Sequence, residues 1–210
     1  MRYERKYKID NLNHRVVEQS LRVHPAGLRK IYPDRTINNI YFDTVHLKNY
    51  HDNVEGVSLR QKVRIRWYGE NTTNIKTPNL EIKHRHNEVG RKDIIPVPNF
   101  ELYQLKTITK ITNDLLPQIT RLMPVLVNAY RRSYYGTSDG KYRLTIDRDL
   151  QYFSLINTNR FTRFNIKEDA VVLEIKYDQE YDNLTDRITQ FLPFRQTKSS
   201  KYVTGVQMTF

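Results

Sequence analysis

The stretch Lys62-Val63-Arg64-Ile65-Arg66-Trp67-Tyr68 decides the fold that we predict for this chain. Side chains of a β-strand alternate between the two faces of a sheet, so the three cations share one face while Val63, Ile65 and Trp67 share the other. Cations on alternate residues are about 7 Å apart and repel one another unless water or an anion lies over them. The strand therefore has either a solvated basic face or a basic face that encloses an anionic ligand.

Length and composition indicate a folded protein. The 210 residues, 38% hydrophobic and 11% aromatic, are enough for one sizeable core, and we expect a single domain over residues 1–210. The formal net charge of +12 points to a polyanionic partner such as nucleic acid, an acidic membrane surface or a phosphate chain.

The chain has no cysteine, which excludes disulfides, thiol nucleophiles and thiolate metal sites. No stretch approaches the roughly 18 apolar residues of a membrane span, so we expect a soluble cytoplasmic protein.

The pattern of alternating apolar and charged residues recurs along the chain. Apolar residues at helical spacing predict short helices, and Asp139-Gly140 predicts a hairpin between two of the strands. The expected strands are 2–9, 37–43, 62–68, 80–85, 125–135, 142–147 and 171–177, and the expected helices lie within 12–21, 100–115 and 184–192. Residues 87–98, with Gly90, Pro96 and Pro98, are expected to be mostly loop with one edge strand through Ile94, and residues 198–202 are expected to precede a last strand.

The charged faces lead to a hypothesis about the site. An antiparallel sheet with one solvated face would look similar, but here most charged faces are enriched in Lys and Arg and carry isolated glutamates at Glu4, Glu81 and Glu174. If the sheet closes with its apolar side outward against helices, the basic rows lie inside a barrel, where they need a multiply charged anion. A triphosphate or polyphosphate is thin enough to enter such a tunnel. A carboxylate among the cations would hold a divalent metal, and Glu4 and Glu174 are the candidates.

A set of ordered segments carries a family resemblance. The segments are Tyr3-Glu4-Arg5-Lys6-Tyr7, Ile40-Tyr41-Phe42-Asp43-Thr44, Val63-Arg64-Ile65-Arg66-Trp67-Tyr68, Leu80-Glu81-Ile82-Lys83, Tyr130-Arg131-Arg132, Arg143-Leu144-Thr145-Ile146-Asp147, Leu173-Glu174-Ile175-Lys176 and Lys198-Ser199-Ser200-Lys201-Tyr202. In these segments the chain resembles the VTC-type polyphosphate polymerase domain of the triphosphate tunnel metalloenzyme (CYTH-like) superfamily. The resemblance implies an α+β, mainly antiparallel β fold: an eight-stranded β-barrel tunnel, lined by basic residues and containing Mn²⁺ or Mg²⁺, with a few helices packed outside.

The resemblance also implies residue roles. Glu174 would anchor the metal with Glu4 as a helper, Tyr130 and Ser200 would donate hydrogen bonds, and Lys198 and Lys201 would hold phosphate near one mouth. The first strand has Arg2 where the superfamily has a further acid. The cations that would line the tunnel and hold phosphates are Lys6, Arg64, Arg66, Lys83, Arg132 and Arg143.

The implied reaction transfers the terminal phosphoryl group of ATP to a growing polyphosphate chain. Such a transfer needs in-line positioning and cations more than a protein nucleophile, and the chain has neither a P-loop nor a convincing Ser/His/Asp set. The alternatives are an inorganic triphosphatase of the same fold, or a protein that binds polyphosphate or nucleic acid without turnover.

Several candidates also have a purely structural interpretation. Glu174 can pair with Lys176 or a cross-strand arginine, Glu4 with Lys8, and Ser200 can cap or turn the chain. We expect Trp67 in the core. Packing is favoured over metal ligation for His84 and His86.

Overall fold

The computed structural model describes residues 2–71, 73–86, 89–156, 158 and 160–210. The chain forms two compact units. Three long strands contribute residues to both of them: β2 (Arg29–Asp43), β8 (Met123–Gly136) and β9 (Tyr142–Ser154). Unit 1 comprises residues 1–35, 130–150 and 168–199, and unit 2 comprises residues 36–129, 151–167 and 200–210.

The sheet of unit 1 follows the order β1-β11-β9-β8-β2, where β1 is Arg2–Ile9 and β11 is Val171–Asp178. The β1–β11 and β11–β9 pairs are antiparallel. Their register sets Lys6 opposite Glu174, and Glu174 opposite Thr145. Charged side chains of neighbouring strands therefore lie on a common face.

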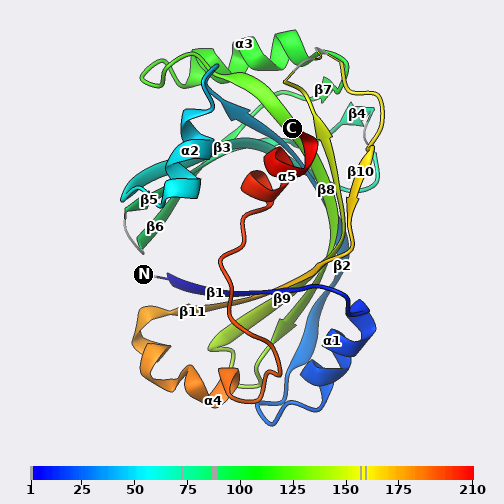
Figure 1. Ribbon diagram of the computed structural model, residues 1–210, viewed down its shortest axis with the longest axis vertical. Helices are drawn as coiled ribbons and strands as arrows, with labels where there is room; N and C mark the ends of the chain where they lie inside the picture. The colour runs from blue at the N-terminus through cyan, green and yellow to red at the C-terminus, as the bar shows by residue number, and fades with distance from the viewer. Residues whose placement is uncertain (1, 72, 87–88, 157, 159) are drawn as a thin grey trace. The chain divides into compact units, whose positions relative to one another are not determined.

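The other face of this sheet is apolar and is covered by helices (Figure 1). Tyr7, Leu173 and Ile146 of the strands pack in one cluster with residues of two helical segments. The first is α1 (His14–Arg22), which begins after Asn13, whose side chain accepts a hydrogen bond from the Arg15 amide. The second is α4 (Asp186–Thr189), which follows the 3₁₀ helix η1 (Gln179–Leu184). The alternation of the sequence is thus resolved into a helix-covered face and a charged face.

Unit 2 continues the order as β9-β8-β2-β3-β5-β6. The new strands are β3 (Leu59–Tyr68), β5 (Asn79–His86) and β6 (Val89–Pro96). A short β10 (Ile166–Glu168) pairs with β9, and β4 (Asn74–Ile75) pairs with β7 (Phe100–Glu101). The helix α2 (Lys48–Glu55) joins β2 to β3 and ends at Gly56, which has a positive φ of 76°.

The apolar face of unit 2 carries the larger core. Val63, Ile65 and Trp67 pack in one cluster with Leu105 and with other residues of α3 (Leu105–Leu115). Trp67 is 1% exposed and its indole N–H donates to the Asn71 carbonyl at 3.0 Å, as a buried indole requires. Its predicted place in the core is confirmed.

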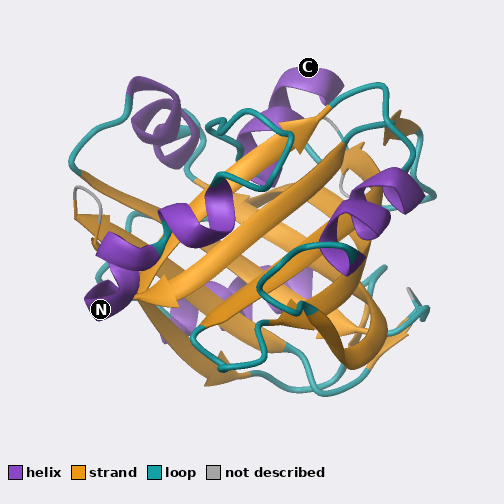
Figure 2. Ribbon diagram, turned by 90° about the horizontal axis from the view of Figure 1, so that it is seen from below, coloured by secondary structure: helices purple, strands orange, loops and turns teal. Residues whose placement is uncertain are grey.

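The predicted fold class is confirmed. Among the described residues more lie in strands than in helices, and the helices pack against the strands (Figure 2). In the part of the chain that the structure describes, the main strand path contains eight strands: β1, β2, β3, β5, β6, β8, β9 and β11. None of the helices in this part is long and apolar enough to cross a membrane.

The edge strand expected through Ile94 is confirmed, but the loop expected over most of residues 87–98 is wrong. Residues 89–96 form β6, which pairs with β5 over the register Asn79↔Pro96 to His86↔Val89. Gly90 and Pro96 suggested a loop, but β6 lies at the end of the strand order, where a proline is tolerated because one side of the backbone needs no partner. Asn87 and Glu88 lie outside the described residues.

The expected last strand is a helix, α5 (Lys201–Thr209), and it does not pack outside the sheet. Ser200 caps its first turn by accepting from the Val203 amide, which confirms the capping interpretation. The Tyr202 ring stacks on Tyr41, whose strand partner is Arg64, so α5 packs on the polar face of unit 2. The Tyr202 hydroxyl donates to Asp43, and burial beside this carboxylate raises the tyrosine pKa.

Candidate functional site

The predicted site residues form two groups, one in each unit. The group in unit 1 lies on the charged face of β1, β11, β9 and β8, where Glu4 is opposite Lys176 and Lys176 is opposite Arg143. The neighbouring row, in which Lys6 is opposite Glu174, also contains both an acid and a base. The site residues of this group are Glu4, Lys6, Tyr130, Arg132, Arg143, Glu174 and Lys198.

Glu174 is the electrostatic centre of this group. It is 5% exposed, and its carboxylate lies 3.0 Å from the Lys176 amine and 3.7 Å from the Arg132 guanidinium. Burial alone would raise the pKa of Glu174, but Lys176, Lys6 and Arg132 outweigh it and hold this pKa well below the usual range. Glu174 is therefore ionised at neutral pH. Its predicted pairing with Lys176 and a cross-strand arginine is confirmed.

Lys6 lies between two carboxylates. Its amine contacts Glu4 at 2.6 Å and donates to the Ser199 carbonyl at 3.1 Å. Burial opposes its charge, but Glu174 and Glu4 outweigh burial and raise the lysine pKa. The predicted pairing of Glu4 with Lys8 is wrong, because Lys8 contacts Glu168 at 2.8 Å instead. Glu4, Lys6 and Lys8 are alternate residues on one face of β1. Their spacing alone therefore did not show whether Glu4 pairs with Lys6 or with Lys8.

Arg132 is held by an acid that the predicted site did not include. Its Nε and Nη2 donate to the two oxygens of Asp147 at 2.5 and 2.7 Å, and its Cζ lies 5.3 Å from the Tyr130 ring. Burial lowers the pKa of Arg132, while Asp147 and Tyr130 raise it more strongly. Asp147 and Arg143 are four residues apart in β9 and so share a face, but only the position of β9 beside β8 shows that Asp147 pairs with Arg132.

Two predicted residues of unit 1 lie at the margin of this group. Arg143 is exposed on β9, opposite Lys176. Lys198 is exposed in the segment that follows the pairing of Thr197 with β1, where the Thr197 amide donates to the Lys6 carbonyl at 2.8 Å. Both side chains are accessible to a ligand. The side chain of Arg2 lies outside the part of the chain described.

The residues around Glu174 suit a hard divalent cation. Glu4 lies 2.6 Å from the Lys6 amine and Glu174 is the strand partner of Lys6, so two carboxyl groups lie near one cation, an arrangement that a further cation stabilises. The Thr145 hydroxyl, opposite Glu174, is buried and has no hydrogen-bond partner among the described residues. Oxygen donors of this kind suit Mg²⁺ or Mn²⁺, which commonly take one or two carboxylates and complete their shell with water and phosphate oxygens. No cluster of three or more His, Cys, Asp or Glu residues occurs among the residues described, and His84 pairs with Asp93 at 3.2 Å.

The group in unit 2 is organised by rows of like charge. Strand register sets Lys62 opposite Lys83, and Lys83 opposite Lys92, across β3, β5 and β6. The next row sets Arg60 opposite Arg85, and both burial and Arg85 lower the pKa of Arg60. Like charges directly opposite one another destabilise a sheet. A face that keeps two such rows is suited to an anion with several charges.

Glu81 is the anionic centre of this second group and was not among the predicted site residues. It is 4% exposed and accepts from Arg64 Nε and Nη2 at 2.8 and 2.6 Å, from Lys92 at 3.1 Å, and lies 3.8 Å from Arg66. Burial opposes ionisation, but Arg64 and Arg66 lower the pKa of Glu81 to about 2. The carboxylate fixes the guanidinium of Arg64 on the polar face.

Arg66 and the C-terminal segment complete the group. Arg66 Nε donates to the Asn39 side chain at 2.8 Å, and Asn39 in turn donates to Asn128 at 2.7 Å. Ser200 accepts from the Lys62 amine at 2.7 Å, so the residue that caps α5 also contacts the basic row. Lys201 begins α5 and is half-buried. The structure thus brings Arg64, Arg66, Lys83, Ser200 and Lys201 into one unit.

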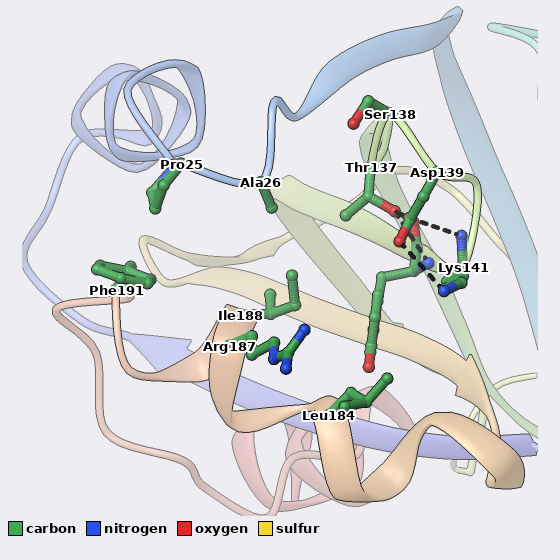
Figure 3. A pocket seen from close by; sticks show the side chains of 11 residues that line it. Pro25, Ala26, Thr137, Ser138, Asp139, Lys141, Leu184, Arg187, Ile188 and Phe191 are labelled. Carbon is green, nitrogen blue, oxygen red and sulfur yellow. Dashed lines mark hydrogen bonds and ion pairs between the residues drawn. The ribbon is translucent and has the colours of Figure 1, made fainter.

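A cavity of about 320 Å³ on the helix side of unit 1 is a poorer candidate (Figure 3). Its polar groups bond mainly to one another: the Thr137 hydroxyl donates to Asp139 at 2.6 Å, and the Lys141 amide donates to the same carboxylate at 3.1 Å. Its remaining lining is largely apolar, with Pro25 and Phe191 among the side chains. We therefore assign the site to the charged faces.

Comparison with known proteins identifies the family. A family model described as the VTC domain matches residues 1–210. The chain belongs to the VTC domain family. Membership places this VTC domain among polyphosphate-related tunnel enzymes that transfer or hydrolyse phosphate. No curated protein sequence matches the chain.

Solved structures share the fold of this VTC domain at low sequence identity. A Bacillus halodurans protein named "putative adenylate cyclase" is 13% identical with a TM-score of 0.60, covering 95% of this chain and 94% of its own. A Vibrio parahaemolyticus protein of the same name is 10% identical with a TM-score of 0.57, covering 96% and 97%. The PH1819 protein of Pyrococcus horikoshii is 11% identical with a TM-score of 0.55, covering 97% and 94%. At these identities the likeness establishes the fold alone.

Proposed function

We propose that this VTC domain is a polyphosphate polymerase that transfers the terminal phosphoryl group of ATP to a growing polyphosphate chain. The observation that carries the proposal is the pair of carboxylates Glu4 and Glu174 surrounded by Lys6, Lys176 and Arg132 on one strand face. Family membership supports the same reaction class. The proposed partners are ATP and polyphosphate. The proposed domain comprises residues 1–210.

Each residue type has a physical task in this reaction. Phosphoryl transfer has a loose transition state with negative charge spread over equatorial oxygens, so positioned cations supply most of the stabilisation. The raised pKa of Lys6 keeps its amine protonated at neutral pH, so the amine can offset the negative charge of a phosphate oxygen throughout the reaction. In unit 2, Glu81 accepts from Arg64 Nε and Tyr41 accepts from Arg64 Nη1 at 3.3 Å, so both residues orient the guanidinium that would bind a phosphate.

Glu4 and Glu174 would hold Mn²⁺ or Mg²⁺, with the Thr145 hydroxyl beside them. A bound divalent cation supplies charge neutralisation of phosphate oxygens. The residues of the chain itself bind, orient and neutralise the phosphates, and no protein nucleophile is needed.

The test is incubation of the purified chain with ATP and Mn²⁺, followed by gel electrophoresis of the polyphosphate. The proposal predicts a ladder of long chains and ADP. Release of orthophosphate from tripolyphosphate without chain growth would replace the polymerase by an inorganic triphosphatase. Thermal stabilisation by nucleic acid but not by tripolyphosphate would overturn both enzymatic assignments.

The matched variants are Lys6→Met and Lys8→Met. Both lysines lie on β1, but Lys8 pairs with Glu168 rather than with the carboxylates of the site. Chain synthesis should fall at least tenfold in Lys6→Met and should stay near the wild-type rate in Lys8→Met. Equal losses in the two variants would show that general surface charge, and not this cluster, supports synthesis.

A further inference from the structure

A cluster of two exposed residues, Tyr32 and Arg35, and the half-buried Tyr134 lies at one edge of unit 1. The rings of Tyr32 and Tyr134 meet edge to face, with centroids 5.9 Å apart and planes at 88°. The guanidinium carbon of Arg35 lies 5.8 Å from the Tyr32 centroid and 5.9 Å from the Tyr134 centroid. Tyr32 is 48% exposed and Arg35 is exposed as well. The three side chains thus hold one another in place, and two of them remain accessible to solvent.

Arg35 differs from the buried and half-buried arginines of the same unit. Arg132 is held by Asp147, Arg148 by Asp34, and Arg5 by Asp182. Among the described residues no carboxylate lies within 4.0 Å of the Arg35 guanidinium, which rests on the two tyrosine rings instead. A guanidinium placed in this way presents a flat cationic surface that aromatic ligands and anions both favour.

The position of the cluster connects it to the phosphate-binding face. Tyr130, Arg132 and Tyr134 are alternate residues of β8, so their side chains lie on the same face at intervals of about 7 Å. In the described residues β2 pairs with β3 only from Ile37 onward, so residues 29–35 form the free edge of the unit 1 sheet. A ligand whose phosphates lie near Arg132 can therefore extend over Tyr134 toward this edge.

We propose that Tyr32, Arg35 and Tyr134 form a platform for the base of the nucleoside triphosphate donor. An inorganic phosphate chain has no aromatic face, so such a platform serves only a ligand with a base attached to the phosphates. Stacking on tyrosine tolerates any base, while Arg35 adds a cation next to the ribose and the first phosphate. The inference rests on the proposed function, and it makes a nucleotide, rather than inorganic triphosphate, the preferred phosphoryl donor.

The test compares ATP with tripolyphosphate, two polyanions that share a triphosphate and differ in the nucleoside. Dissociation constants of both ligands are measured by calorimetry for the full chain, for Tyr32→Leu and Arg35→Gln, and for the control Tyr103→Leu. Tyr103 is a 62% exposed tyrosine of unit 2. Loss of one stacking partner is expected to weaken ATP binding about tenfold in Tyr32→Leu. Tripolyphosphate binding should stay within twofold, and Tyr103→Leu should leave both constants unchanged.

Each other outcome has a definite meaning. If Tyr32→Leu weakens both ligands equally or neither, or if the wild-type chain binds ATP no more tightly than tripolyphosphate, the platform is refuted and the proposed function stands. If the wild-type chain binds neither ligand, the proposed function fails and the platform with it. If Tyr32→Leu instead weakens only a single-stranded oligonucleotide, the cluster is a nucleic-acid contact and the nucleotide platform is refuted.

Discussion

Glu81→Gln is the most informative test of the electrostatic arrangement. In the folded chain Arg64, Arg66 and Lys92 surround the carboxylate, and its pKa is lowered to about 2 from the ordinary 4.5. At about 1.4 kcal/mol per pKa unit, this difference corresponds to about 3 kcal/mol of stability at neutral pH. The glutamine variant keeps the shape of the side chain and an acceptor oxygen but loses the charge, so it should be less stable than the wild type by about this amount at pH 7.

The sign of the pH dependence follows from the lowered pKa. A group whose pKa is lower in the folded state stabilises the protein above its unfolded pKa, and the contribution is lost as the pH falls toward the folded pKa. Between pH 7 and pH 3 the carboxylate should lose about 2 of the about 3 kcal/mol, so the stability difference between the wild type and Glu81→Gln should shrink to about 1 kcal/mol.

Urea unfolding at pH 7, 5 and 3 measures this difference directly. The matched control is Glu55→Gln, which removes an exposed carboxylate from the end of α2 and should change stability by less than about 0.5 kcal/mol. A stability difference for Glu81→Gln that is the same at pH 7 and pH 3 would refute the reasoning, because the lost charge would then not be the cause.

Two further predictions follow from the described contacts. Gly205→Ala should destabilise the chain by about 1–3 kcal/mol in urea unfolding, because an added Cβ would lie 2.5 Å from a Leu126 methyl and 2.6 Å from the Tyr152 ring, and a neutral effect would contradict the packing of α5. Glu174→Gln should abolish the rise in melting temperature that Mn²⁺ gives the wild-type chain, whereas an unchanged rise would place the metal elsewhere.

The sequence was sufficient for the strand at residues 62–68 and insufficient for most of β6 and for α5. In residues 62–68 the alternation of cations with Val63, Ile65 and Trp67 specifies both the strand and its buried face. Helix α5 contains three consecutive residues of low helix propensity: the β-branched Val203 and Thr204, and Gly205. There the Ser200 cap and packing against Leu126 and Tyr152 override local preference.

The candidate site shows the same division. Alternation predicts that Arg64 and Glu81 lie on charged faces, and the resemblance implies that Arg132 does too, but their partners depend on which strands are neighbours. Arg64 pairs with Glu81 because β3 lies beside β5 with Arg64 opposite Glu81, and Arg132 meets Asp147 because β8 lies beside β9. Strand order and register come from the tertiary fold, so no spacing rule could have identified these ion pairs.

Tripolyphosphate binding to Arg64→Ala tests the central claim, that the basic faces bind phosphate, most directly. The variant keeps Lys92 and Arg66 near Glu81, so the fold should persist. The control is Arg91→Ala, which removes an exposed arginine of β6 in the same unit. Loss of a charge-assisted contact worth about 1.5–3 kcal/mol should weaken tripolyphosphate binding at least tenfold in Arg64→Ala and hardly at all in Arg91→Ala. Equal binding by the wild type and Arg64→Ala would contradict the account, because this face would then not bind the phosphate chain.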